Sequence, residues 1–244
     1  MFDKPKFRFN KHPRFSVNHL ADYLSTTNAT QRVAVIRRAK FPRTREASSY
    51  AQIRSPLKKF LASNPIDTTA LDDLIERMDA KARRDPEARD EALRCRDAVT
   101  CFKAVYLDNR MARFKFFTVP KDISLRIDGV SVNIHLDGAI TEERKGETLA
   151  GGIVFFLAGS EAARKNIETR RKAAANLVHW GLEGGNMEPV ARLCMSMDIY
   201  GNALEKASVS NARFRANVSD SCREVCARWD DVEPPEGYDG PDWS

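Results

Sequence analysis

Residues 130–158 read VSVNIHLDGAITEERKGETLAGGIVFFLA, and this stretch decides the fold. Two apolar runs flank a charged turn. The first run alternates apolar and polar residues, as a half-buried strand does, whereas the second is almost wholly apolar, which is typical of a strand buried on both faces. Asp137 stands where the first run ends. The stretch therefore predicts two strands of one sheet, with a carboxylate at the end of the first.

Further strand signals surround this stretch. Residues 113–119 are rich in β-formers, and residues 123–127 alternate before Asp128-Gly129, a dipeptide that favours a tight hairpin turn. Residues 192–200 and 204–207 predict two more strands. Helical periodicity predicts helices at residues 16–24, 31–41, 47–62, 67–84, 86–108, 160–182 and 209–229.

The order of these elements predicts an α+β or α/β fold, in which a helical region precedes a mixed sheet flanked by helices. The length of 244 residues is sufficient for a substantial core. We expect four parts: a basic aromatic arm at 1–15, a helical region at 16–85, an α/β core at 86–229 and a disordered acidic tail at 230–244.

Basic and acidic residues concentrate at opposite ends of the chain. Residues 1–59 hold 14 Lys and Arg against three acids, whereas residues 230–244 hold six acids and no base. Because cations that neutralise phosphates release counterions, the basic end predicts DNA or RNA as partner; a solvated basic surface without a partner is the alternative. The tail could also fold back and screen the basic end. The candidate phosphate-binding residues are Lys4, Lys6, Arg8, Lys11, Arg14, Arg32, Arg37, Arg38, Lys40, Arg43, Arg45, Lys58 and Lys59.

Two features of the basic end leave alternatives open. The arm interleaves Phe with Lys and Arg, which suits stacking on unpaired bases but equally predicts an edge strand pinned on the body. The helices at 16–24 and 31–41, joined by a polar turn, have a helix-turn-helix outline that could read DNA. Paired short helices are also common packing units.

Taken together, these elements resemble an uncharacterised bacterial family with a restriction-endonuclease-like, PD-(D/E)XK core. The resemblance rests on segments spread over most of the chain: Ser16–Leu24, Arg32–Pro42 with Lys40-Phe41-Pro42, Val130–Asp137, Gly151–Leu157, Leu193–Tyr200 and Cys222–Trp229. It implies a nuclease-like sheet, with Asp137 as the one catalytic and metal-binding residue that carries over.

The chain departs from the family at the other catalytic positions. Gly152 stands where the second acid would be, and Val154 where the lysine would be. Phosphodiester hydrolysis by this route needs two carboxylates to hold Mg²⁺ and a cation to stabilise developing charge. The resemblance therefore implies a degenerate, non-catalytic core that needs no cofactor. Mg²⁺ is expected only if the charged turn supplies relocated groups, namely Glu142, Glu143, Glu147 and Lys145.

Three functions follow from these patterns. We favour a cytoplasmic nucleic-acid-binding protein, within a bacterial defence or mobile-element system; the alternatives are a protein-interaction subunit of a nucleoprotein assembly and a magnesium nuclease with relocated ligands. No window is apolar enough to predict a membrane span. The five cysteines lack a CxxC pair, which indicates reduced thiols. Asp198, in an otherwise apolar strand, must be paired or marks a site.

Overall fold

A computed structural model of the chain describes residues 6–44, 50–118, 122–144, 146–157, 159, 164–185 and 188–243. Helices flank two mixed sheets, so the predicted α+β class is confirmed. The helices are α1 (Val17–Ser25), α2 (Ala29–Lys40), α3 (Ala51–Ala62), α4 (Thr69–Arg84), α5 (Arg89–Asp108), α7 (Ile167–Leu182) and α8 (Ala212–Trp229), with a 3₁₀ turn at Met111–Arg113. The strands are β1 (Arg14–Ser16), β2 (Lys115–Phe117), β3 (Ile123–Ile127), β4 (Val130–Ile134), β5 (Gly138–Arg144), β6 (Glu147–Phe156), β7 (Glu188–Asp198) and β8 (Ala203–Lys206).

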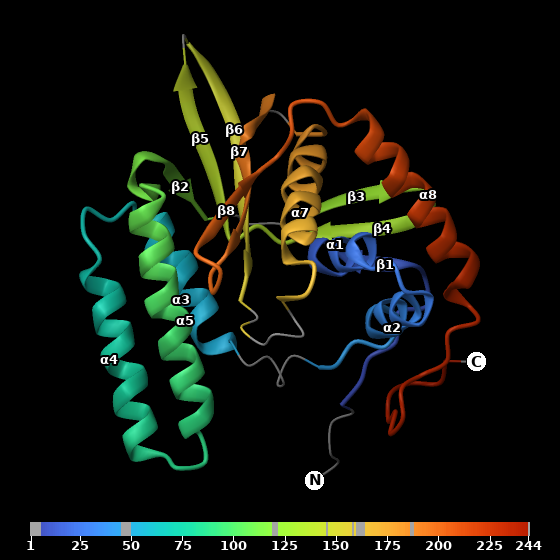
Figure 1. Cartoon of the computed structure of the whole chain (residues 1–244), viewed down its shortest axis with the longest axis horizontal. Coiled ribbons are helices and arrows are strands. Elements are labelled where there is room, and N and C mark those ends of the chain that lie inside the picture. The colour runs from blue at the N-terminus through green and yellow to red at the C-terminus, as the bar shows by residue number, and fades with distance from the viewer. Residues whose placement is uncertain are drawn as a thin grey trace.

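The larger sheet has five strands in the order β2-β5-β6-β7-β8. β5 and β6 form an antiparallel hairpin, and α7 then crosses over so that β7 runs parallel to β6. Helices cover both faces of this sheet (Figure 1). α3, α4 and α5 lie on one side, and α7 with α1 lies on the other.

Alternation along β6 explains why the sheet has a core on each face. Ile153 and Phe155 join the core beneath α3 and α5, whereas Val154 and Phe156 join the core beneath α1 and α7. All four are buried. Because successive strand residues point to opposite faces, an apolar run in this strand supplies both cores at once.

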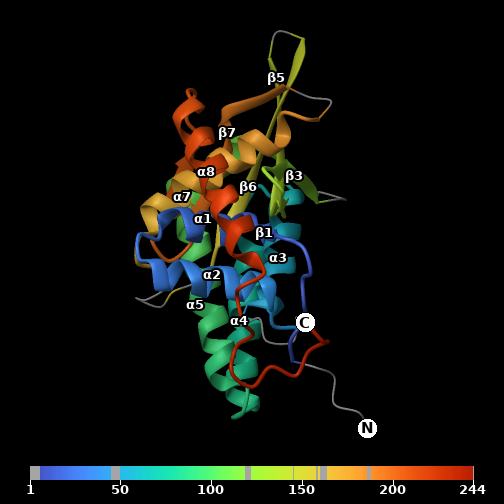
Figure 2. The same cartoon turned by 90° about the vertical axis from the view of Figure 1, so that its right-hand side faces the viewer.

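The smaller sheet has three strands in the order β1-β4-β3, with β1 parallel to β4 and β3 antiparallel to it. α8 contacts both β3 and β4, and Figure 2 shows α8 and α1 on this side of the molecule. The buried residues of α8 recur at intervals of three and four and form one apolar face; they are Val218, Cys222, Val225 and Trp229.

The helices of the first half of the chain pack in two different cores. α1 and α2 belong to the core that contains the small sheet and α7, whereas α3 and α4 pack in the core with α5. The predicted helical region at 16–85 is therefore shared between two cores. The segment expected to be a charged turn after Asp137 is itself strand β5, which pairs with β6 from Gly138↔Ile153 to Arg144↔Glu147.

The arm is held against the segment that follows α2. Arg8 N donates to Pro42 O (2.9 Å), and Thr44 N donates to Lys6 O (2.9 Å). Phe7 is buried, and Phe9 stacks on Phe41 with ring centroids 5.7 Å apart. From residue 6 onward, this geometry favours the pinned-edge interpretation of the arm over free stacking residues.

The acidic tail was predicted to be disordered, but residues 230–243 lie along the arm and the end of α2. Asp239 accepts from the backbone N–H groups of Lys6 (2.8 Å) and Phe7 (3.2 Å). Tyr238 packs on Phe7 and Phe41 with centroids 5.8 and 5.1 Å away. Aromatic side chains anchor the described acidic segment, and these contacts match the alternative of a tail folded back on the basic end.

Candidate nucleic-acid interface

Asp137 is a buried ion pair partner of Arg54. Its side chain is fully buried, and Arg54 donates to it through Nε and Nη2, each at 2.8 Å. The backbone N–H of Phe155 donates to Asp137 Oδ2 at 2.8 Å. Both carboxylate oxygens thus have protein partners, and the Arg54–Asp137 pair links α3 to the five-stranded sheet.

The strand positions next to Asp137 are filled by apolar side chains. Val154, at the position where the resemblance would place a lysine, is buried in the core with Phe156. A side chain on Gly152, at the position of the second acid, would begin 2.7 Å from a methyl group of Leu136. Among the described residues, the structure therefore brings no second acid and no lysine beside Asp137, where the nuclease chemistry would need them.

The charged hairpin does not replace the missing groups within the described residues. Glu142 and Glu143 stand four and five residues along β5 from Gly138, which places them more than about 13 Å along the strand at a rise of about 3.4 Å per residue. Glu142 is bound by Arg192 (2.7 Å), whose guanidinium lowers the pKa of that carboxyl. Lys145 lies outside the described residues. In the part of the chain that the structure describes, no cluster of three or more His, Cys, Asp or Glu side chains could hold a metal ion.

Asp198 is the second buried carboxylate, and the structure decides between its two predicted readings in favour of pairing. Arg164 donates to its two oxygens at 3.0 and 3.2 Å, and Arg171 contributes a longer contact of 3.4 Å. Gly201 N also donates to Oδ1 at 3.0 Å. The charge is compensated by two arginines, so Asp198 is explained as an anchor between β7 and the segment leading into α7.

Lys40 and Arg32 are candidate cations that hold elements of the fold together. Lys40 is buried, and its ammonium donates to the carbonyls of Trp229 (2.8 Å), Asp230 (3.1 Å) and Val232 (3.0 Å). Arg32 binds Glu224 at 2.8 Å. These residues fix α2 to α8 and to the base of the tail, which argues against α2 as a freely presented recognition helix.

The remaining candidates are scattered. Lys58 and Lys59 lie on α3, on the opposite side of the central sheet from α2. Lys4 and Arg45 fall outside the described residues. Exposed candidates on the arm and the segment after α2 are Lys6, Arg8, Lys11, Arg14 and Arg43, of which Arg43 lies over the Phe7 ring at 5.7 Å.

The structure brings Arg37 and Arg38 together with two cations that the sequence did not single out. Lys165, which precedes α7, and Arg170, in its first turn, line the same hollow of about 620 Å³. Among the described residues of its lining, Asp22 is the one acid, so these residues carry a formal charge of +3. We call this hollow the α2–α7 groove; it is lined by Asp22, Ser25, Thr26, Gln31, Ala34, Val35, Arg37, Arg38, Lys165, Asn166 and Arg170.

Asp22 organises the cations of the α2–α7 groove. Its carboxylate binds Arg38 at 2.7 Å and lies 3.5 Å from Arg170 Nε. The Arg38 side chain is 60% exposed, which leaves it accessible to a ligand. Asn166 Nδ2 donates to Ser25 O (3.0 Å) and joins the start of α7 to the end of α1. The cations therefore lie on α2 and at the start of α7, and Asp22 of α1 joins the two sets.

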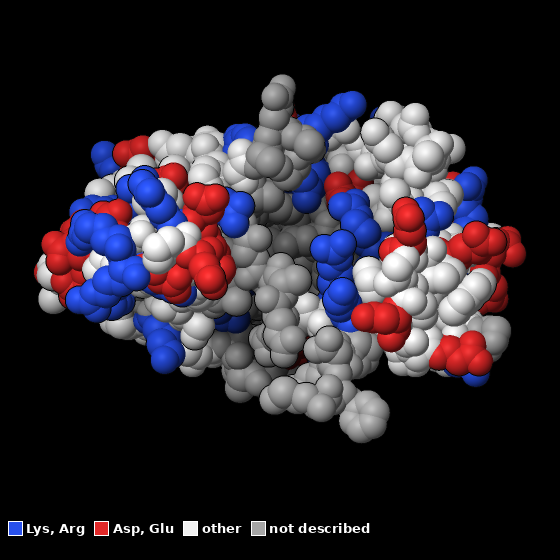
Figure 3. All heavy atoms as spheres, turned by 90° about the horizontal axis from the view of Figure 1, so that it is seen from below, with Lys and Arg blue, Asp and Glu red and all other residues white. Residues whose placement is uncertain are grey.

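The groove lies at the end of the sheet where the parallel strands β6 and β7 finish and α7 begins. Ligands of α/β sheets commonly bind at the carboxyl ends of the strands, where helix N-termini favour anions. Figure 3 looks onto this base of the molecule and shows Lys and Arg side chains in a column beside a hollow. Position and charge both suit an anionic ligand.

His19 lies beside the groove and predicts a pH dependence. Burial lowers its pKa, Arg38 and Arg170 act in the same direction, and Asp22 opposes them. In the unfolded chain His19 binds a proton near its ordinary pKa of 6.5, whereas in the folded chain it binds that proton only at lower pH. The free energy of unfolding therefore falls as the pH drops below 6.5. Urea denaturation should show that the free energy of unfolding falls less between about pH 7.5 and about pH 5.5 for His19→Gln than for the original chain. Equal declines in both proteins would contradict this assignment.

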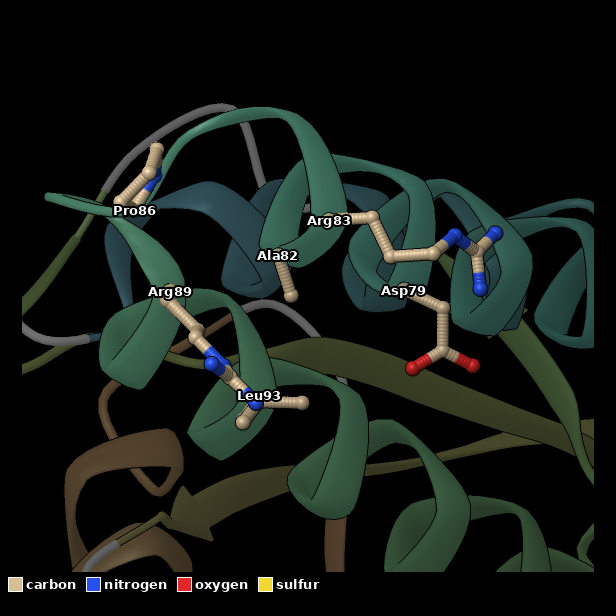
Figure 4. Close-up of a pocket in the computed structure, with 6 residues that line it drawn as sticks. All are labelled: Asp79, Ala82, Arg83, Pro86, Arg89 and Leu93. Atoms are coloured by element: carbon tan, nitrogen blue, oxygen red, sulfur yellow. The ribbon is translucent and has the colours of Figure 1, made fainter.

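A second hollow lies between α4 and α5 at the end of their hairpin, with a volume of about 320 Å³ (Figure 4). Ala82, Pro86 and Leu93 supply apolar lining, while Arg83 and Arg89 flank it. Its acid, Asp79, is engaged by Arg96 at 3.2 Å. This hollow has fewer cations than the α2–α7 groove and is distant in sequence from the basic end, so we do not assign it the same role.

Sequence reasoning missed the groove's α7 half for a clear reason. Lys165 and Arg170 belong to the nearly balanced middle of the chain, where no local excess of charge marks them. Only the crossover of α7 brings them to α2. Arg54 was missed as the partner of Asp137 because 83 residues separate the two.

No protein-family model matches this chain, and a search of curated proteins returns no significant match.

Proposed function

We propose that this protein binds nucleic acid through its phosphates, with the α2–α7 groove as the principal contact and the exposed arm cations as an extension. The observation that carries the proposal is the convergence of Arg37, Arg38, Lys165 and Arg170 on one groove, where the described lining residues include one acid. Cations mounted on rigid elements and aimed at one space attract a polyanion more effectively than the same charges scattered over a surface.

The proposed activity is binding without hydrolysis. The resemblance to a nuclease-like core supports a nucleic-acid partner, while the pairing of Asp137 with Arg54 and the apolar Val154 argue against metal-centred hydrolysis at that point. Arg38 and Arg170 contact Asp22 and would exchange this carboxylate for a phosphate oxygen. Guanidinium groups suit this exchange because they bind carboxylate and phosphate with the same fork geometry.

Binding should be measured by fluorescence anisotropy with labelled single-stranded RNA, single-stranded DNA and duplex DNA of mixed sequence over a salt series. We expect binding that weakens steeply with salt. Arg38→Ala/Lys165→Ala should weaken it about tenfold and reduce the magnitude of the log–log salt slope by about 1.4–1.8, because two phosphate contacts are lost. The loss should be similar for different sequences of one nucleic-acid type, since phosphate contacts carry no base information.

Lys58→Ala/Lys59→Ala provides the matched control, because it removes two charges on the opposite side of the sheet. This variant should change the affinity by less than about threefold through the long-range field alone. An equal loss in both variants would reject the groove as the contact. Failure of the original chain to bind any of the three probes at low ionic strength would reject the function itself.

A further inference from the structure

The tail occupies the arm in the way that a single-stranded nucleic acid would. Asp239 places a carboxylate on the adjacent backbone N–H groups of Lys6 and Phe7. Tyr238 packs against Phe7 at a tilt and edge-on against Phe41, and Trp243 also lies edge-on to Phe41 with centroids 6.1 Å apart. Proteins hold phosphates with backbone N–H groups and hold unpaired bases against aromatic side chains, and the tail makes contacts of both kinds with the arm.

The tail also reaches the α2–α7 groove. The carbonyl of Glu233 accepts from Arg37 Nε at 3.0 Å, and Arg37 lines the groove. Lys40 binds the carbonyls of Asp230 and Val232 and so fixes the start of the tail at the end of α2. The segment beyond this anchor is tethered within reach of both the arm and the groove.

We infer that the acidic tail is an intramolecular competitor of nucleic acid, bound to the arm and to Arg37 in the free protein and displaced when a strand binds. This inference rests on the proposed function. A tethered segment acts at a high effective concentration, so weak contacts suffice to occupy a site. Phe7 and Phe41 are buried in the free protein partly by Tyr238, and displacement of the tail makes their faces available to bases.

The test neutralises the tail without shortening it. Glu233→Gln/Glu236→Gln/Asp239→Asn keeps Tyr238, Trp243 and the Lys40 anchor. The control, Asp73→Asn/Glu76→Gln/Glu87→Gln, neutralises three exposed acids of the α4–α5 hairpin, so both proteins gain three units of net charge. Single-stranded RNA and DNA should bind the tail variant about tenfold more tightly than the original chain, whereas the control should gain less than about threefold.

Trp243 reports on the tail directly. Addition of a single strand should change the tryptophan emission of the original chain, and Trp243→Phe should remove most of that change. Equal gains in the tail variant and its control would overturn the inference and leave the proposed function standing, as would binding that leaves Trp243 emission unaltered. If neither the original chain nor the tail variant binds any strand at low ionic strength, the proposed function and the inference fail together.

Discussion

Replacing Arg54 with alanine should destabilise the protein by about 3 kcal/mol, because it leaves the buried carboxylate of Asp137 with one donor among the described residues, the N–H of Phe155. The value is at the lower end of the range for broken buried pairs because the Arg54 side chain is 39% exposed. Urea denaturation followed by circular dichroism measures the loss. The pair thus has a structural consequence far larger than that of an exposed ion pair.

The double variant Arg54→Ala/Asp137→Asn separates a buried charge from lost packing. It should restore about half of the free energy of unfolding that Arg54→Ala loses. A neutral amide at residue 137 needs no counter-charge and still accepts from the N–H of Phe155. Lys58→Ala on the same helix should stay within about 0.5 kcal/mol of the original chain. If Arg54→Ala lowered the free energy of unfolding no more than Lys58→Ala does, the burial of the Asp137 carboxylate would not depend on Arg54.

Lys40→Met should destabilise the protein by about 2–3 kcal/mol, since the carbonyls of Trp229, Asp230 and Val232 lose a charged donor in a buried place. Burial lowers the pKa of Lys40, and the nearby Asp230 and Asp231 oppose that shift, so the gain from the contacts is partly offset by desolvation. Thermal and urea denaturation give the change in the free energy of unfolding.

Arg38→Met on the same helix is the matched comparison, because that side chain is 60% exposed and its pair with Asp22 should contribute less than about 1 kcal/mol. Lys40→Met should also loosen the tail, which the emission of Trp243 reports. Lys40 lies 5.5 Å from the Trp243 ring, so a local change is expected even before unfolding. A loss for Lys40→Met that matches the loss for Arg38→Met would contradict the role of Lys40 as an anchor.

Local patterns were sufficient for most elements of the fold. The hairpin of β3 and β4 follows the predicted Asp128-Gly129 turn, and the apolar run of β6 is buried on both faces as expected. β5 was missed because Thr141 to Arg144 are polar and charged, so its strand character depends on pairing with β6. The start of α5 was placed too early, since Pro86 lies in the turn before Arg89.

The candidate site was less predictable because it depends on tertiary neighbours. Charge counting marked Arg37, Arg38 and Lys40 as equivalent, yet Lys40 is buried against carbonyls while the two arginines line the groove. Whether a cation is held in internal contacts depends on α8 and the tail, which lie more than 180 residues away in sequence. The sequence likewise marked Asp137 as an isolated acid, since nothing local indicates that Arg54 approaches it.

The shared strand β6 has a consequence for dividing the molecule. Because adjacent residues Ile153 and Val154 belong to opposite cores, removing one packed half would uncover an apolar face of the sheet that the other half cannot cover. Neither half is a module that evolution or a protein engineer could transplant alone. The groove, the arm and the tail are inherited together with the helices behind the sheet.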